Sequence, residues 1–455
     1  MSRISFRLMT TAAAAVLVLI ASPPAFSDSH VRIVRLSYVE GDVQIDRGSG
    51  YEKAMMNLPI TEGTSIRSAD DGRAEIELED ASAIRVTPRT EIRFPELSLR
   101  DTGAKLSTVE VVKGTAYLDF NRSKKDELNV LFGREKIALA RSSRLRIGLN
   151  DSSAAVAVFK GDIQVEGPSG ITQVKKNQTA DFDLSANDLS ANDQPVLAKN
   201  IEKQPYDNWD KQQSEFHSRY SGNSYNSYSP YAYGSSDLNY YGNFFDAPGY
   251  GTLWQPYFTD ASWDPFMHGA WAFSPGFGYG WVSAYPWGWT PYHYGTWVFL
   301  PSYGWAWQPG GAWTGWYSQP RILNPPRGFA VPRAPSTGRT TLVVNRTAYS
   351  APSVQSRNRL AIPNNSAGLG IRRGEINDLA TVSRQIDQRP AAPRGGGTQR
   401  QGATAQFPSA RGNAENGPSR ASQPAPRGMS QSAPAPRSAP SSAPSHSGTG
   451  QAPHR

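Results

Sequence analysis

The chain has 455 residues, a formal net charge of +8 and no cysteine. The absence of cysteine excludes disulfide-stabilised folds, thiolate metal sites and thiol nucleophiles. Residues 321–455 contain 18 Arg, no Lys and four acidic residues, a net charge of +14, which leaves −6 for residues 1–320. The basic balance therefore belongs to the C-terminal part and does not indicate a cationic globular surface.

Residues 1–27 have the organisation of a secretory signal peptide. Two arginines precede an apolar run from Ala12 to Ala21, and a small-residue cleavage site ends at Ser27. The run is shorter than the roughly 20 residues needed to cross a bilayer, which favours a cleaved leader over a permanent anchor. We therefore expect a mature protein without a transmembrane segment, located in the periplasm or cell envelope or secreted.

Residues 31–185 alternate between apolar and polar side chains in short runs. Within residues 73–79, Ala74, Ile76 and Leu78 share one face and charged residues occupy the other. This two-residue period is typical of a half-buried strand, and Gly, Pro and Asp turn signals separate the runs. The pattern predicts an all-β domain.

Short sequence words recur within this domain. Residues 41–46 (GDVQID) match residues 161–166 (GDIQVE), and residues 114–119 are a looser copy. Such repetition predicts stacked β units, in a β-roll or solenoid-like arrangement where each unit buries an apolar face against its neighbour.

The order of the motifs resembles the FecR periplasmic domain. Five motifs carry the resemblance: residues 39–43 (VEGDV), 58–68 (LPITEGTSIRS), 71–76 (DGRAEI), 84–86 (IRV) and 112–114 (VKG). It covers about residues 33–120, with a second, partial copy to about residue 185. The resemblance implies an all-β fold and, in the best-known members, relay of an extracytoplasmic signal through a membrane helix to a sigma factor.

Residues 186–204 have the composition of a linker, and residues 205–220 are expected to form a short helix. Asp207 lies near the helix start, and Trp209 and Phe216 lie two turns apart on one face. Duplicated Asn-Asp pairs near the linker could offer calcium ligands, but they lack a glycine-punctuated loop, which favours a turn or a helix cap.

The composition changes abruptly over residues 221–320, which contain 11 of the 12 Trp. Residues 263–275 realign with residues 289–301, 26 positions later, and residues 254–256 hint at an earlier copy. Aromatic residues flanked by Gly and Pro predict short strands with tight turns. The region resembles an uncharacterised Trp/Tyr/Gly/Pro repeat region that follows FecR-like domains in other exported bacterial proteins. That resemblance implies no known activity.

Two uses of the aromatic rings remain open. The rings expected in the core are equivalent in two copies: Trp271 with Trp297, and Trp281 with Trp307. By contrast, Trp287, Trp305 and Trp313 lie between Gly and Pro residues, and we expect them to face solvent. There they could stack on the sugar rings of a glycan or peptidoglycan. A region without Lys, Arg or Glu suits such a neutral ligand better than nucleic acid.

No catalytic, cofactor-binding or metal-binding motif is recognisable. The histidines His30, His217, His268 and His293 form no His-x-x-His or Glu-flanked metal motif. A nucleophile elbow and a glycine-rich phosphate loop are also missing from the sequence. We therefore expect a protein that is not an enzyme and needs no cofactor.

Residues 321–350 form an extension that can add a strand at residues 340–344. Residues 351–455, rich in Pro, Ser, Ala, Gly and Arg, are expected to be disordered, because they cannot bury enough surface to offset the entropy of ordering. Their spaced arginines could associate electrostatically with anionic envelope polymers.

Together these features favour a non-enzymatic exported envelope protein that binds or organises a partner through its β modules. The first alternative is a carbohydrate- or peptidoglycan-binding protein that uses the aromatic repeat. The second is a FecR-type sensor or regulator that acts through another membrane protein. The expected partner is an envelope protein or a glycan, and no nucleic acid is expected.

Overall fold

The computed structural model describes residues 32–100, 102–121, 125–185, 194–222, 231–274, 278–310, 320–350 and 365–387. These residues all belong to residues 1–406, one of the two compact units into which the chain divides. The predicted signal peptide, Trp313 and residues 388–455 lie outside the described residues. Strands predominate over helices in the described parts, as the all-β prediction requires.

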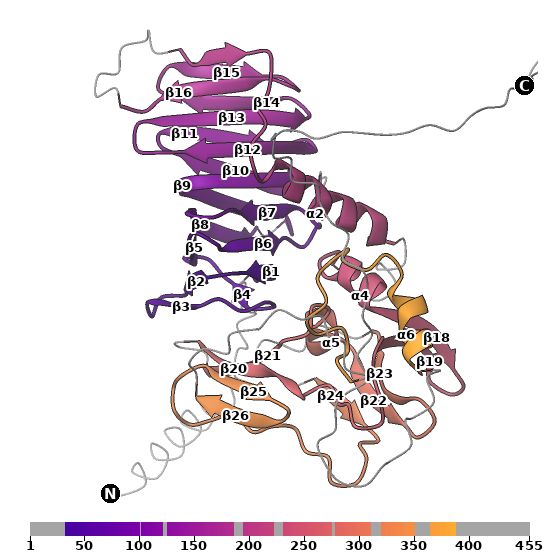
Figure 1. Cartoon of the computed structure of the whole chain (residues 1–455). Helices are drawn as coiled ribbons and strands as arrows, with labels where there is room; N and C mark the ends of the chain where they lie inside the picture. The colour runs from indigo at the N-terminus through magenta and orange to yellow at the C-terminus, as the bar shows by residue number, and fades with distance from the viewer. Residues whose placement is uncertain are drawn as a thin grey trace, which may run out of the picture. The chain divides into compact units, whose positions relative to one another are not determined.

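The N-terminal β domain contains strands β1 to β17 (Figure 1). Their bounds are β1 Val34–Glu40, β2 Val43–Asp46, β3 Tyr51–Lys53, β4 Pro59–Ile60, β5 Ser65–Ser68, β6 Arg73–Glu77, β7 Ala83–Val86, β8 Glu91–Leu99, β9 Lys105–Phe120, β10 Glu127–Phe132, β11 Glu135–Leu139, β12 Ser143–Leu149, β13 Ser153–Lys160, β14 Ile163–Gly167, β15 Gly170–Val174, β16 Thr179–Asp183 and β17 Val196–Ala198. Neighbouring strands are mostly antiparallel, whereas β9 and β10 pair in parallel. Strand β9 joins two ladders, because its first half pairs with β8 and β10 and its second half with β7 and β12.

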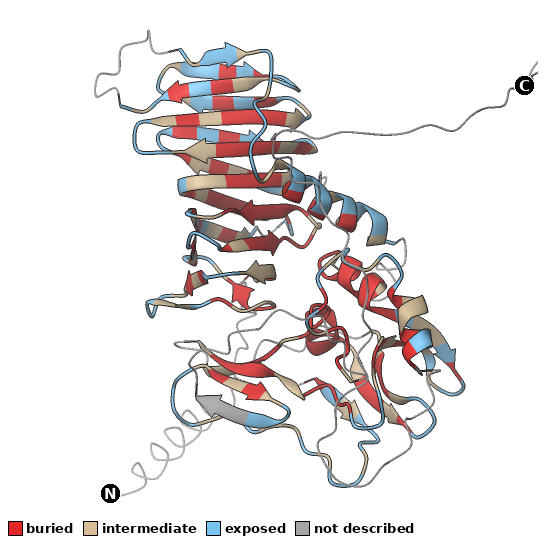
Figure 2. Ribbon diagram, viewed as in Figure 1, coloured by how far each residue is buried: buried red, intermediate tan, exposed pale blue. Residues whose placement is uncertain are grey.

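The inward side chains of both ladders form one apolar core. Ala74, Ile76 and Leu78, which were predicted to share the buried face, are all buried. They belong to the same cluster as Leu145 and Ile147 of the second half of the domain. Figure 2 shows buried residues on successive strands of the stack. The predicted stacked β arrangement is confirmed.

The repeated sequence words occupy equivalent structural positions. Gly41 precedes β2 with φ 70°, and Gly161 precedes β14 with φ 79°. A Cβ atom at Gly41 would approach the Asp71 carbonyl oxygen to 2.2 Å, and one at Gly161 would approach the Ser142 carbonyl oxygen to 2.7 Å. Glycine is therefore required twice for the same reason, a left-handed turn packed against a neighbouring chain segment.

Helix α2 (Asp207–Tyr220) follows the β domain and packs on the ladder that contains β7, β9 and β12. The Asp207 carboxylate accepts hydrogen bonds from Tyr117 at 2.8 Å and Arg146 at 2.6 Å. Trp209 and Phe216 are both buried, in agreement with the predicted shared face. The helix thereby covers the outer face of a ladder whose inner face is already buried.

The aromatic region contains two further sheets and two short helices. The bounds are α4 Ser235–Tyr241, β18 Gly242–Ala247, β19 Gly251–Pro256, β20 His268–Ser274, β21 Gly278–Ser283, α5 Thr290–His293, β22 Thr296–Leu300, β23 Gly304–Gln308, β24 Arg321–Leu323, β25 Thr341–Val344 and β26 Thr347–Ser350. One sheet has the order β18-β19-β23-β22-β24, and the other β21-β20-β25-β26. Strand β25 is the strand predicted at residues 340–344.

The aromatic repeat is a hairpin that occurs three times: β18–β19, β20–β21 and β22–β23. In register, Trp271 faces Trp281 in the second hairpin and Trp297 faces Trp307 in the third. The first hairpin places Phe244 opposite the tryptophan of residues 254–256. The four repeat tryptophans predicted to be core are all buried. Cross-strand ring pairs therefore supply the packing that aliphatic side chains provide elsewhere.

In each hairpin, a glycine leaves the space that the tryptophan ring of the second strand occupies. A Cβ atom at Gly242 or Gly269 would come within 2.4 Å of the ring of Trp254 or Trp281, respectively. At Gly295 the same atom would lie 2.6 Å from Nε1 of the tryptophan that closes the third hairpin. The spacing of Gly and Trp in the repeat is therefore a steric requirement of this packing.

Residues 365–387 correct the prediction that the chain is disordered from residue 351 onward. They form turns and helix α6 (Leu379–Asp387), and Ile371, Leu379 and Ile386 are buried. These side chains belong to the aromatic core cluster. The Pro/Ser/Arg-rich composition of residues 351–455 concealed this short amphipathic segment. We call residues 365–387 the docked segment.

Candidate functional site

The rings predicted to form a sugar-stacking platform are buried where the structure describes them. The exposed fraction is 0% for Trp287 and 3% for Trp305. The Trp287 indole donates a 2.7 Å hydrogen bond to the Ala367 carbonyl, and Trp305 packs 4.7 Å from Phe329 between ring centroids. The prediction that these two rings face solvent is wrong, because Trp305 belongs to strand β23 and more distant chain segments cover both rings. Trp313 lies outside the described residues.

A buried network of ion pairs joins the β domain to the chain that follows it. Glu75 of β6 is fully buried and contacts Arg85 at 2.8 Å, Arg373 at 2.6 Å and His217 at 2.9 Å. Asp237 of α4 contacts Arg373 at 2.8 Å. These contacts connect β6 and β7 with α2, α4 and the docked segment. The charged face of β6, which the alternating pattern marks as polar, is thus an interior face.

Arg35 extends this network toward the loop that precedes α5. Its guanidinium lies 2.7 Å from Asp237 and donates a 2.6 Å hydrogen bond to the Pro286 carbonyl. Asn57 accepts a hydrogen bond from Arg35 and donates to the carbonyls of Ser283 and Tyr285. The polar contacts between the β domain and the aromatic region are therefore specific and paired.

The neighbouring cations determine the protonation state of the central carboxylates. Burial alone would raise the pKa of Glu75, but the charges of His217, Arg373 and Arg85 lower that pKa well below its usual range. Burial also acts on Asp237, and the Arg373 and Arg35 guanidiniums lower its pKa. Both groups are therefore ionised and fully engaged. This arrangement suits a structural network and not a general base, which needs a pKa near neutrality.

Burial and the nearby charge of Arg35 lower the pKa of His293 to about 3. The unfolded-state pKa is near 6.5, so the unfolded chain takes up the additional proton as pH falls. The stability that neutral His293 contributes is complete above about pH 6.5 and is lost as the pH falls toward 3. Between pH 7 and pH 5 we expect the free energy of unfolding of the wild type to fall by about 2 kcal/mol more than that of His293→Gln.

Urea unfolding of both proteins at the two pH values measures this difference. Burial raises the pKa of four acids, Glu77, Asp80, Glu135 and Asp210, and these acids are present in both proteins and cancel in the comparison. Equal losses in the two proteins would contradict the assignment of a buried neutral imidazole.

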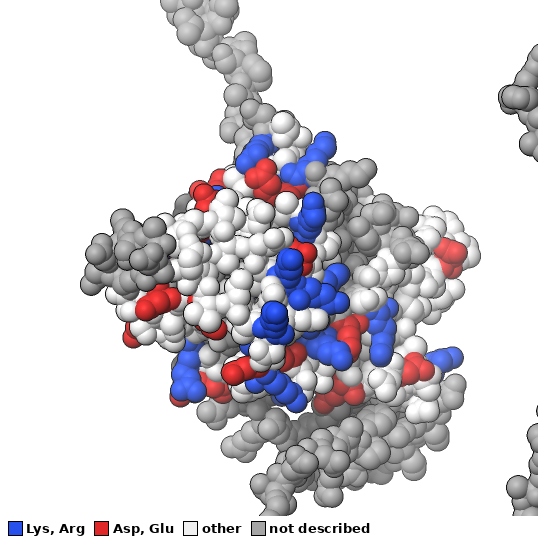
Figure 3. Space-filling view, turned by 90° about the horizontal axis from the view of Figure 1, so that it is seen from above, with Lys and Arg blue, Asp and Glu red and all other residues white. Residues whose placement is uncertain are grey.

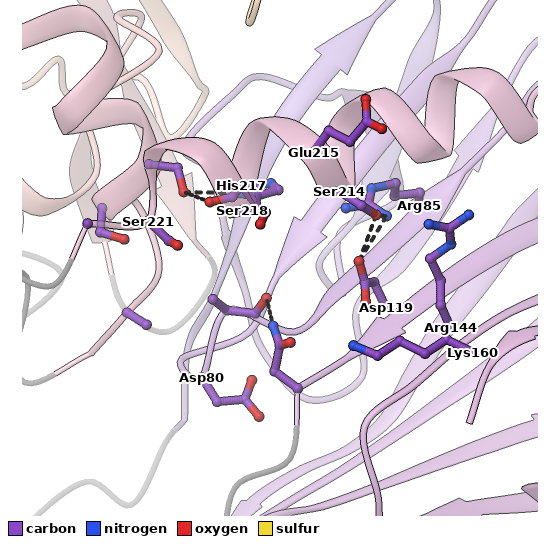
Figure 4. A pocket seen from close by; sticks show the side chains of 16 residues that line it. Asp80, Arg85, Asp119, Arg144, Lys160, Ser214, Glu215, His217, Ser218 and Ser221 are labelled. Carbon is purple, nitrogen blue, oxygen red and sulfur yellow. Dashed lines mark hydrogen bonds and ion pairs between the residues drawn. The ribbon is translucent and has the colours of Figure 1, made fainter. Parts of the chain in front are cut away.

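A polar pocket of about 870 Å³ lies between α2 and the adjoining ladder of the β domain (Figure 4). Six charged residues line it: Asp80, Arg85, Asp119, Arg144, Lys160 and Glu215. Five serines and Asn121 add neutral donors and acceptors, His217 and Gly222 also line the pocket, and only two alanines are apolar. No Phe, Tyr or Trp side chain is among the described lining residues. Sequence reasoning missed this pocket, because its charges come from distant strands and from one helix.

The last strands of the two ladders leave their outer edges unpaired among the described residues. Strand β15 pairs only with β14, and β17 only with β16. These two strands carry three of the six exposed large hydrophobic side chains of the described chain: Ile171, Val196 and Leu197. Figure 3, viewed from above, shows a band of Lys and Arg side chains with Asp and Glu among them. Unpaired edges with exposed apolar side chains are sites where another strand can add.

Among the described residues, no group of three or more His, Cys, Asp or Glu is arranged to hold a metal ion. The helices that the structure describes are all too short or too polar to span a membrane.

Comparison with protein families confirms the two resemblances. Residues 64–164 match the FecR protein family, and residues 235–324 match a family of unknown function, DUF6600. The expected FecR-like segment and the expected C-terminal region without a known activity are thus both found. No curated protein matches the sequence.

Solved structures add a distant similarity. Two crystal structures of a "putative anti-sigma factor" from Parabacteroides distasonis ATCC 8503 match 30% of this chain with 15% and 16% sequence identity and a TM-score of 0.25. The match spans 59% of the length of those solved chains.

Proposed function

We propose that the protein is a non-enzymatic component of the cell envelope that binds a partner protein through its FecR-type β domain. The observation that supports this function is the pair of open edges at β15 and β17, with Ile171 and Val196 each 69% exposed. An extended segment of a partner could hydrogen-bond to such an edge and cover its apolar side chains.

Site-specific photo-crosslinking in the envelope tests this function. A photoreactive residue at position 171 or 197 should capture the same partner, whereas one at Lys53, on the edge hairpin at the other end of the domain, should not. The double variant Ile171→Lys, Leu197→Lys should lose the partner while keeping its β circular dichroism spectrum, because charged side chains block strand addition. Equal capture at all three positions would contradict the proposal. So would capture of a second copy of this chain.

A FecR-type regulator is the second candidate, and the FecR match at residues 64–164 favours it. In this function the captured partner is a membrane protein that passes a signal onward. Deleting the gene should then change transcription of a sigma-factor-dependent gene set, and the double edge variant should reproduce the change. The glycan-binding alternative was based on exposed rings at Trp287 and Trp305, and both rings are buried. Association of the C-terminal arginines with anionic envelope polymers stays a prediction.

A further inference from the structure

The charges that line the pocket between α2 and the β domain are not all neutralised by one another. Arg85 lies 2.6 Å from Asp210, and Arg144 lies 3.2 Å from the same carboxylate. Asp119 accepts a 2.7 Å hydrogen bond from Ser214, and Glu215 pairs with Lys211 at 3.7 Å.

Two lining charges, Asp80 and Lys160, remain without an ion-pair partner within the part of the chain that the structure describes. Asp80 accepts a 2.9 Å hydrogen bond from the Ser82 backbone N–H and contacts no described cation. Lys160 ends β13, and its ammonium contacts no described acceptor. Figure 4 shows the Asp80 carboxylate and the Lys160 ammonium both directed into the pocket.

We propose that this pocket binds a ligand with separate ammonium and carboxylate groups, of the size of a short peptide. Asp80 receives the ammonium, and Lys160 receives the carboxylate. The volume of about 870 Å³ lies within the range of pockets that enclose small molecules. The serines and Asn121 supply hydrogen-bonding groups for the amides between the charged ends.

Burial provides a physical reason for Asp80 to attract a cation. It raises the pKa of this carboxyl, and the hydrogen bonds from Ser82 offset the effect only in part. A ligand ammonium would favour the ionised form and repay the loss of solvent around it. The same contact would place the other end of an extended ligand in the Lys160 half of the pocket.

Other ligand classes fit the lining less well. A phosphate or another purely anionic ligand would meet the carboxylates of Asp80, Asp119 and Glu215. A divalent cation would need a cluster of ligands, which the described residues lack. A sugar that binds by stacking would need a Phe, Tyr or Trp ring, and none is among the described lining residues. A ligand with both charges can pair its ammonium with Asp80 and its carboxylate with Lys160.

The test is binding of trialanine to the full chain, measured by ligand-observed saturation-transfer NMR. N-acetyl-trialanine lacks the ammonium and trialanine amide lacks the carboxylate, and each should bind about 5–10-fold more weakly than trialanine. Lys160→Met should abolish the difference between trialanine and its amide. Asp80→Asn, which keeps an acceptor for Ser82, should abolish the difference between trialanine and its N-acetyl form.

Lys53→Met is the matched control, because Lys53 lies on β3, an exposed hairpin remote in sequence from the pocket. It should bind all three peptides as wild type does. Absence of saturable trialanine binding would overturn the proposal, and so would equal binding of the three peptides. Binding of a neutral disaccharide that neither pocket variant weakens would also overturn it and would assign the pocket to sugars.

Discussion

Trp287→Ala should lower the free energy of unfolding by about 3–5 kcal/mol, the range for loss of a large buried aromatic side chain. The indole is fully buried and stacks on Tyr285 at 5.0 Å between ring centroids. It also lies 4.8 Å from Trp254 and donates its only N–H to Ala367 of the docked segment. The substitution leaves a cavity and removes the donor of a buried carbonyl. Urea unfolding monitored by circular dichroism measures the loss.

Hydrogen exchange gives this prediction a second readout. Because the Trp287 indole holds Ala367, amides of residues 365–387 should exchange faster in Trp287→Ala than global destabilisation alone explains. Tyr303→Ala is the control, since Tyr303 is 49% exposed, and it should change stability by less than about 1 kcal/mol. If the two variants were equally stable and Trp287→Ala instead abolished glycan binding, Trp287 would be the surface ring that the sequence suggested.

Sequence periodicity was sufficient for the architecture of both β regions. Alternation identified the strand around Ile76, and the repeat of Trp271 and Trp297 predicted short strands with tight turns, which the structure pairs as two hairpins. These signals are local, because a strand needs only a two-residue period and a tight turn. They cannot show what covers the other face of a strand. For that reason the buried state of Glu75 and Glu77 was not predictable from residues 73–79.

The missed features share this long-range origin. Trp287 looks like a turn residue, but Ala367 and Trp254 enclose it from elsewhere in the chain. The docked segment did carry a local signal: Leu379, Val382 and Ile386 have helical spacing. The average composition of residues 351–455 does not show this spacing, because it involves only a few residues of a long polar segment. The pocket offered no comparable pattern, since Asp80 and Lys160 lie in different halves of the β domain.

Arg373→Ala should lower the free energy of unfolding by about 3–5 kcal/mol, because it removes one partner from a buried ion-pair network. The Arg373 guanidinium is 2% exposed and contacts both Glu75 and Asp237. It also donates a 3.0 Å hydrogen bond to the Ser37 carbonyl. No water can replace these donors without access to the interior. The loss should therefore exceed that of any single surface ion pair in this protein.

The adjacent Arg372 is a matched control for this prediction. Its guanidinium is 61% exposed and pairs with Glu40, so Arg372→Ala should cost less than about 1 kcal/mol. The two variants remove the same side chain from neighbouring positions of the docked segment, and composition and helix content are unchanged between them. Similar losses in both would contradict the buried network. A large loss confined to Arg373→Ala, with faster exchange in residues 365–387, would mean that a segment from the Arg-rich part of the chain is held by two carboxylates, Glu75 of the β domain and Asp237 of α4. Its position would then depend on Glu75 staying ionised, a state that the Arg85, Arg373 and His217 charges maintain.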